Sequence, residues 1–301
     1  MLLTIGIPVK NEATNIPELK KVIEEVVEKI NKKNIDVEII INDNNSNDDS
    51  LLLLESWQKD FPIIRLFSLK NTISFQASIK SMMSNANGDA FVVYQSDLQD
   101  PAELILAFID YWLSGYEIVA GVITKREEFI ISRLSRIIFY RMLKIVADDF
   151  FIAGFQDFYL ISRRVYSSLV NLPDEGLYLR GHISSKFDNI MQLPYQRNKR
   201  VSGSTSFNFA RKYSLALDAI LLFGTRFIRI LSVTSFLIFI VSTFLGIVLG
   251  VSYILGYRFP IKGWASISLF ILTLISIIGL AIGLILEYLI RIYKQLIFYK
   301  N

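Results

Sequence analysis

Three short polar segments of this chain carry residue types that bind nucleotides and divalent cations. The first contains Pro8, Asn11 and Glu12, the second is Asp-Asn-Asn-Ser-Asn-Asp at residues 43–48, and the third is Gln-Ser-Asp-Leu-Gln-Asp-Pro at residues 95–101. Carboxylate and amide oxygens accept hydrogen bonds from a base or a ribose, and they are the ligands that Mg²⁺ and Mn²⁺ prefer. Asn, Asp and Ser are also common turn formers, so each segment alone is a weak signal.

The pattern of apolar residues predicts the elements that position these segments. Apolar runs predict strands at residues 2–7, 37–41, 63–67, 90–94 and 117–120, and amphipathic runs predict helices at residues 16–31, 51–57, 75–83 and 101–113. This alternation is typical of an α/β domain with a mostly parallel, Rossmann-like sheet. The three polar segments follow the first, second and fourth strands. Ligands bind at the carboxyl ends of parallel strands, so we expect the segments to line one site.

The segments and several later motifs resemble those of the family-2 glycosyltransferases of the GT-A fold. The similarity is closest to the polyprenyl-phosphate glycosyltransferases, which include dolichol-phosphate mannose synthase and the bactoprenol glucosyltransferases. The matching stretches are Pro8 to Glu12 with P-x-x-N-E, residues 43–48 with D-D-x-S-x-D, residues 95–101 with D-A-D-L-Q-D-P, residues 156–160 with G-D-F-R-L, and residues 200–207 with R-x-x-G-x-S-S-Y. Gly263-Trp264 and residues 287–293 match the tail of the bactoprenol group.

The resemblance implies a role for each matching residue. Nucleotide binding falls to Pro8, Asn11, Glu12, Asp43 and Ser96. The residues expected to bind the metal, Mg²⁺ or Mn²⁺, are Gln95, Asp97 and Gln99. The catalytic residues are expected to be Asp97 and Asp157. The acceptor phosphate is expected to bind Arg126, Arg197 and Arg200, because the planar guanidinium of arginine suits phosphate. Asp157 either orients the acceptor or stabilises the sugar cation. The alternative is a buried structural acid paired with arginine.

Three departures from the family pattern bear on activity. Gln95 replaces the first acid of the metal motif, Asn44 replaces the second acid of the D-D pair, and Ile123 stands where many relatives carry arginine. A neutral amide binds a cation more weakly than a carboxylate. The alternative function is therefore a catalytically weakened, nucleotide-sugar-binding membrane scaffold that partners a lipid flippase.

The hydrophobic excess of the chain lies near its end. Hydrophobic residues make up 52% of the sequence, and residues 230–257 and 263–286 contain no charged residue. Each stretch exceeds the roughly 20 residues that cross a bilayer core, which predicts a two-helix transmembrane hairpin at about 230–257 and 263–289. Basic residues are more numerous outside the hairpin (Arg211, Lys212, Arg226, Arg229, Arg291, Lys294 and Lys300) than in its loop (Arg258 and Lys262). The positive-inside rule then places the large domain in the cytoplasm.

These patterns divide the chain into three parts. Residues 1–205 form the predicted catalytic domain, residues 206–229 predicted amphipathic helices at the membrane interface, and residues 230–301 the transmembrane helices with a short tail. The alternative for residues 206–229 is packing on the catalytic domain. The sequence predicts a multi-pass protein of the cytoplasmic (inner) membrane.

The composition excludes several function classes. The chain has no cysteine, and His182 is its one histidine, which excludes thiol catalysis and sites built from several cysteines or histidines. The net charge of +4 comes without a dense basic stripe, so we expect no nucleic-acid partner. No Q-x-x-R-W motif of processive polysaccharide synthases is present.

The expected function combines the motifs, the hairpin and the resemblance. We expect an inverting, metal-assisted hexose transfer from a nucleotide-sugar, UDP-glucose first, to undecaprenyl phosphate at the cytoplasmic membrane face. The product would be a lipid-linked sugar for modification of cell-envelope glycans. The expected partners are the nucleotide-sugar, the polyprenyl phosphate lipid, a flippase and a second copy of the chain.

Overall fold

The computed structural model describes residues 1–125, 154–174, 177–198, 225–256 and 263–298. These residues fall into two compact units, one ending at residue 198 and the other beginning at residue 225. Each unit is described by itself below.

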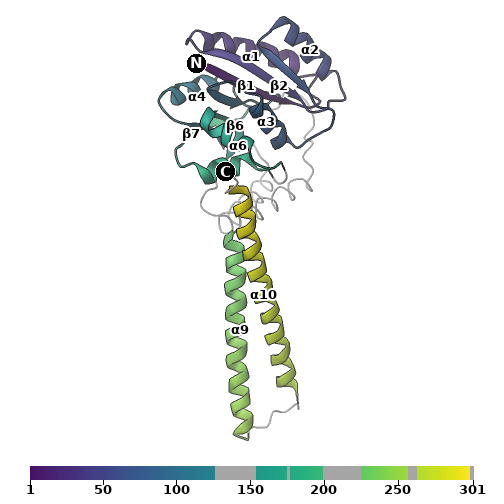
Figure 1. Ribbon diagram of the computed structural model, residues 1–301, viewed down its shortest axis with the longest axis vertical. Coiled ribbons are helices and arrows are strands. Elements are labelled where there is room, and N and C mark those ends of the chain that lie inside the picture. Colours follow the sequence, from purple (N-terminus) through teal and green to yellow (C-terminus); the bar gives the residue numbers. More distant parts are fainter. Residues whose placement is uncertain (126–153, 175–176, 199–224, 257–262, 299–301) are drawn as a thin grey trace. The chain divides into compact units, whose positions relative to one another are not determined.

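The first unit is an α/β domain (Figure 1). Its first half comprises β1 (Leu2–Val9), α1 (Ile16–Asn31), β2 (Asp36–Asp43), α2 (Ser50–Asp60), β3 (Ile64–Ser68), α3 (Phe75–Ser84), β4 (Ala90–Val93), α4 (Leu104–Leu113) and β5 (Ile118–Lys125). Its second half comprises β6 (Phe155–Ser162), α6 (Arg163–Val170), α7 (Leu179–Lys186) and β7 (Ile190–Gln196). All nine elements predicted up to residue 120 are present, with their ends shifted by a few residues.

The strands form one sheet of order β3-β2-β1-β4-β6-β5-β7. β1 pairs in parallel with β2 and β4, β2 with β3, and β5 with β7, whereas β6 is antiparallel to both of its neighbours. The predicted mostly parallel sheet is therefore confirmed. The sequence analysis did not predict β6 or β7, and β6 inserts between β4 and β5.

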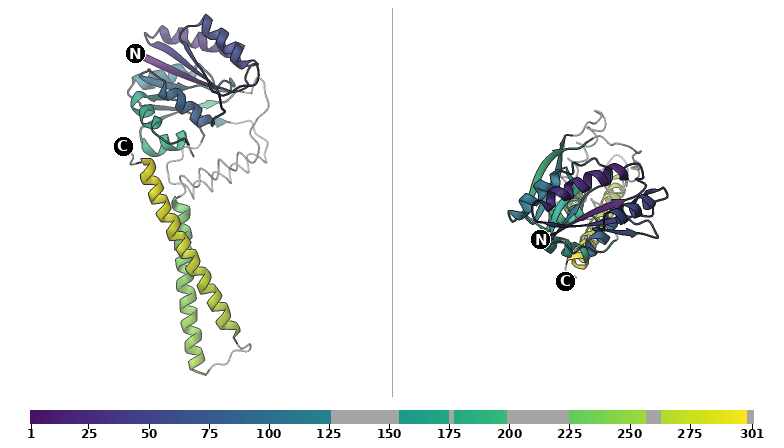
Figure 2. Two further views of the ribbon diagram at one scale, coloured as in Figure 1. Left: turned by 45° about the vertical axis from the view of Figure 1, so that its right-hand side comes forward. Right: turned by 90° about the horizontal axis from the view of Figure 1, so that it is seen from above.

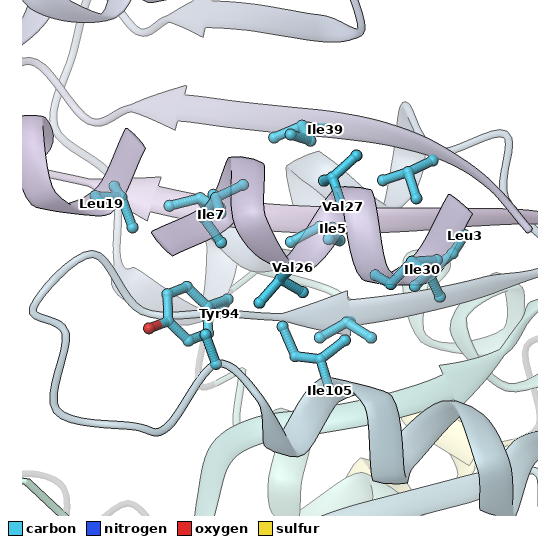
Figure 3. Packing of buried hydrophobic residues seen from close by; sticks show 14 of the residues in the cluster. Leu3, Ile5, Ile7, Leu19, Val26, Val27, Ile30, Ile39, Tyr94 and Ile105 are labelled. Carbon is cyan, nitrogen blue, oxygen red and sulfur yellow. The ribbon is translucent and has the colours of Figure 1, made fainter. Parts of the chain in front are cut away.

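The core forms where α1 covers the centre of the sheet. Leu3, Ile5 and Ile7 of β1 are fully buried, and Figure 3 shows Val26 and Val27 of α1 packed over this strand. α1 begins with proline in its first turn, where the missing N–H costs no helical hydrogen bond. Its apolar residues recur on one face, as predicted. This packing fixes β1 and so fixes the loop that follows it.

The second unit is a pair of long apolar helices, α9 (Thr225–Ile254) and α10 (Trp264–Phe298). The two helices contact each other, and Figures 1 and 2 show them running as a pair that diverges toward the connection between them. Their apolar windows, Ser232–Ser252 and Ser266–Leu289, are long and apolar enough to cross a membrane, at about 31 and 36 Å for a rise of 1.5 Å per residue. Most large apolar side chains of these windows are exposed.

The helix boundaries bear on the predicted division of the tail. α9 begins at Thr225, so residues 225–229 belong to the long helix and not to a separate interfacial one. The rest of the predicted interfacial segment, residues 206–224, lies outside the described residues.

Candidate active site

The three polar segments lie together at one edge of the sheet. β1 lies between β2 and β4, and its register with β2 aligns Val9 with Asp43. The loops after these three parallel strands therefore leave the sheet at neighbouring positions. This arrangement agrees with the expectation that the loops share one ligand-binding edge.

Hydrogen bonds tie the first loop to the second. The Asn11 N–H donates to Oγ of Ser46 at 2.9 Å, and Oδ1 of Asn11 accepts from the Asn47 N–H at 2.8 Å. The Glu12 N–H donates to Oγ of Ser50 at 2.9 Å. Asn11 therefore has a structural role that joins two loops, in addition to any contact with a ligand.

The third loop is tied to the first strand and is strained. Oγ of Ser96 donates to the carbonyl of Pro8 at 3.0 Å. Leu98, Asn11 and Asn45 all have φ between 54° and 57°, in the left-handed region. Asparagine tolerates this region, but leucine rarely adopts it. Backbone strain of this kind clusters at functional sites, and here it falls on Leu98 in the third loop.

Within the described part of the chain, Asp43 has a buried, unpaired acceptor oxygen at this edge. Its side chain is buried, and Oδ2 accepts from the Ser46 N–H at 3.3 Å and from Oγ of Ser68 at 3.5 Å. Oδ1 is buried and has no hydrogen-bond partner among the described residues. Leaving a buried acceptor unpaired costs about 1–3 kcal/mol. A donor on a bound base or ribose would satisfy this oxygen, which suits the predicted nucleotide role.

Asn44 explains one departure from the family pattern. Its Nδ2 donates to the Ile73 carbonyl at 2.9 Å, and its Oδ1 accepts from the Ile73 N–H, also at 2.9 Å. An aspartate could make the second bond but not the first, because a carboxylate has no N–H. Asn44 therefore holds the loop before α3 in place.

Asp157 is held by two side chains from other elements. It lies near the start of β6, which pairs antiparallel with β4 through Val93 and Tyr159, so it faces the same edge as the three loops. Oδ1 accepts from Nε2 of Gln76 at 3.1 Å and lies 3.4 Å from Nε of Arg180. Asp157 is thus paired with an arginine, as in the structural alternative, and its catalytic role stays a prediction.

The predicted metal ligands lie in one loop, the segment that follows β4. Oδ1 of Asp97 accepts from the Gln99 N–H at 3.2 Å, and Gln95 lies two residues before Asp97 in the same loop. Among the described residues no group of three acidic or histidine side chains is arranged to hold a metal alone. Mg²⁺ commonly binds through one or two carboxylates and completes its shell with substrate phosphates and water. One carboxylate and two amide oxygens fit such a substrate-completed site.

Of the three arginines predicted to bind the acceptor phosphate, the structure describes one. Arg197 lies against the third loop, with Nη2 3.2 Å from Oε1 of Gln95. Arg126 and Arg200 lie outside the described residues.

The geometry described so far is an α/β domain with three polar loops at one edge of its sheet, and sequence comparison decides its family. Residues 4–167 match glycosyl transferase family 2. The chain belongs to this family. This glycosyltransferase is 30% identical to the uncharacterized glycosyltransferase YkcC of Bacillus subtilis, over 97% of this chain and 90% of that protein. It is 26% identical to the bactoprenol glucosyl transferase of Shigella phage SfV, over 98% of this chain and 95% of that protein.

A solved structure agrees on the fold. The glucosyl-3-phosphoglycerate synthase of Mycobacterium tuberculosis superposes with a TM-score of 0.52 at 18% identity, covering 73% of this chain and 79% of that one. The glycosyltransferase therefore has the GT-A fold.

Several contacting residues of the site were missed in the sequence. Gln76 and Arg180 hold Asp157. Asp100 accepts from Arg197, and the Tyr195 hydroxyl in turn donates to Asp100. Asp100 is part of a recognised motif, but Gln76 and Tyr195 belong to no motif, and only long-range packing brings them to the site.

Proposed function

We propose that this glycosyltransferase transfers a hexose from a nucleotide-sugar to a polyprenyl phosphate at the cytoplasmic face of the membrane. UDP-glucose is the first candidate for the donor. The observation that carries the proposal is the extent of the similarity to bactoprenol glucosyl transferase, which covers 98% of the chain and so includes α9 and α10 as well as the catalytic domain. A lipid phosphate lies at the bilayer surface, and a membrane anchor raises the effective concentration of enzyme and acceptor.

The proposed step is a single displacement. An oxygen of the lipid phosphate attacks the anomeric carbon, and the bond from this carbon to the diphosphate oxygen breaks as the new bond forms. The nucleoside diphosphate leaves with the bonding electron pair, and the configuration inverts. A phosphate monoester has its second pKa near ~6, so the acceptor is mostly ionised at neutral pH and needs no strong base.

The residues of the site have matching roles in this proposal. Asp43, Glu12 and the loops around Asn11 and Ser96 hold the nucleotide. Asp157, fixed by Gln76 and Arg180, stabilises the positive charge that develops on the sugar or orients the acceptor. Asp97, Gln95 and Gln99 would hold Mg²⁺ or Mn²⁺, which supplies positive charge next to the leaving diphosphate.

The membrane arrangement and the partners are part of the same proposal. α9 and α10 form a transmembrane hairpin, with the catalytic domain in the cytoplasm. A flippase that moves the lipid-linked sugar and a second copy of the chain are the proposed protein partners.

Release of nucleoside diphosphate tests this proposal against the scaffold alternative. The purified chain in detergent is given UDP-glucose with and without undecaprenyl phosphate, and UDP is measured. The transferase releases UDP only when the lipid is present, and Asp157→Asn lowers the rate by about 100-fold through loss of charge stabilisation. A scaffold would bind UDP-glucose without lipid-dependent release. Near-normal turnover of folded Asp157→Asn would remove this residue from the mechanism.

A further inference from the structure

Arg197 places a positive charge inside the predicted metal-binding loop. It follows β7 and reaches the loop after β4, where Nη2 lies 3.2 Å from Oε1 of Gln95 and 3.6 Å from Oδ2 of Asp97. Its Nε donates to Oδ1 of Asp100 at 3.1 Å. The guanidinium thus contacts two of the three residues predicted to bind the metal.

The surroundings fix this arginine in place. The side chain of Asp100 is fully buried, and its Oδ1 also accepts from the Tyr195 hydroxyl at 2.5 Å. The Asn198 N–H donates to the Gln99 carbonyl at 2.8 Å, which joins the end of β7 to the third loop. Only 20% of the Arg197 side chain is exposed. A cation held this firmly is part of the site and not a mobile surface charge.

The position of Arg197 has two electrostatic consequences. A guanidinium donates paired hydrogen bonds to phosphate oxygens, so it can neutralise part of a diphosphate without a metal. It also repels a divalent ion that approaches Gln95 and Asp97, and it occupies their oxygens. Gln95, which is neutral, does not offset this repulsion as the aspartate of related motifs would.

We propose that Arg197 is a resident cation of the donor-diphosphate site. It holds Gln95 and Asp97 in the ligand-free enzyme, binds the diphosphate of the donor, and weakens the binding of a free divalent ion. This inference rests on the proposed nucleotide-sugar donor, and it assigns Arg197 to the leaving group in place of the acceptor-phosphate role predicted from the sequence.

Two binding measurements on the full chain in detergent test the assignment. UDP and GDP binding is measured by calorimetry in EDTA, and Mn²⁺ binding is measured without nucleotide from the electron paramagnetic resonance signal of free Mn²⁺. Arg197→Gln is expected to weaken nucleoside diphosphate binding in EDTA by about tenfold and to strengthen Mn²⁺ binding by about threefold or more. Arg164→Gln is the matched control, because Arg164 pairs with Glu117 on the exposed surface, and it should change neither value.

Two further variants separate the charge from the fold. Arg197→Gln leaves buried Asp100 without its cation, which destabilises the protein. Arg197→Lys keeps the charge and should keep the weak Mn²⁺ binding of the original protein. Arg197→Gln combined with Asp100→Asn removes both buried charges and should still lose nucleotide binding in EDTA. A double variant that binds UDP or GDP in EDTA as the original protein does would overturn the inference.

The remaining outcomes distinguish this inference from the proposed function. If Arg197→Gln weakens binding of a short-chain polyprenyl phosphate and leaves nucleotide binding unchanged, the arginine serves the acceptor and the inference is wrong. If the original protein binds neither UDP nor GDP, with or without Mn²⁺, the proposed donor is itself contradicted.

Discussion

Asn44 shows how a single amide positions a loop of the site. It exchanges two hydrogen bonds with the backbone of Ile73, as two neighbouring strands would. Asn44→Asp should lower the stability of the catalytic domain by about 1–3 kcal/mol, because the Ile73 carbonyl loses its donor and faces a carboxylate. Urea denaturation of the full chain in detergent measures the change. Asn47→Asp, an exposed substitution in the same loop, is the control, and equal stability of the two variants would contradict this role.

His182 gives the domain a component of pH-dependent stability. It is buried on α7, and burial, with a smaller effect of Lys186, lowers its pKa from 6.5 to about 4. Between these two values the unfolded chain binds a proton that the folded chain does not. Stability therefore falls as the pH decreases through this window, by about 2 kcal/mol at pH ~5 from this residue.

Replacing the histidine should remove this component. Between pH ~7 and pH ~5, the free energy of unfolding of the His182→Gln variant should decrease by about 2 kcal/mol less than that of the original protein. Urea denaturation at the two pH values measures the difference. An identical pH dependence in both proteins would show that His182 does not titrate on unfolding.

At the scale of elements, the first half of the domain could be predicted because its signals are local. Apolar runs mark β1, β2 and β4, and the polar residues that follow each strand mark the site. β6 could not be predicted in this way, since its antiparallel insertion between β4 and β5 depends on pairing over more than 60 residues of sequence. The contacts of Gln76 with Asp157 and of Arg197 with Gln95 come from such long-range packing, so the sequence left these partners unassigned.

The contact between α9 and α10 makes a testable element-scale prediction. A Cβ built on Gly279 would lie 3.6 Å from Cβ of Ser235, within the range of about 3.5–4.5 Å for disulfides. The chain has no cysteine, so the pair Ser235→Cys and Gly279→Cys should form one intramolecular disulfide on mild oxidation. Trypsin cuts after Arg258 and Lys262, and mass spectrometry then detects the two helices as linked peptides.

The matched control for this disulfide uses the neighbouring side chain. Phe236 is 51% exposed, so Phe236→Cys with Gly279→Cys should not link. Equal linkage in both pairs would mean that the faces of the two helices are assigned wrongly.

At the scale of the whole molecule, the distribution of basic residues predicts the orientation in the membrane. The stretches flanking the helix pair carry more lysine and arginine than its short loop, which favours a cytoplasmic catalytic domain. In spheroplasts, a membrane-impermeant maleimide should label Tyr257→Cys, which follows α9 in the sequence, and not Lys59→Cys on α2. Lys59→Cys should react only after permeabilisation, and its labelling in intact spheroplasts would reverse the proposed orientation.

Transfer of sugar to lipid tests the proposed function of the whole molecule most directly. The full-length enzyme is incubated with undecaprenyl phosphate and a panel of radiolabelled nucleotide-sugars, and the lipid is extracted and chromatographed. We predict label in a lipid-phosphate-linked hexose, from UDP-glucose first, and a loss of about 100-fold in Asp97→Asn. Absence of labelled lipid with every donor, from protein that is folded and binds nucleotide, would contradict the account.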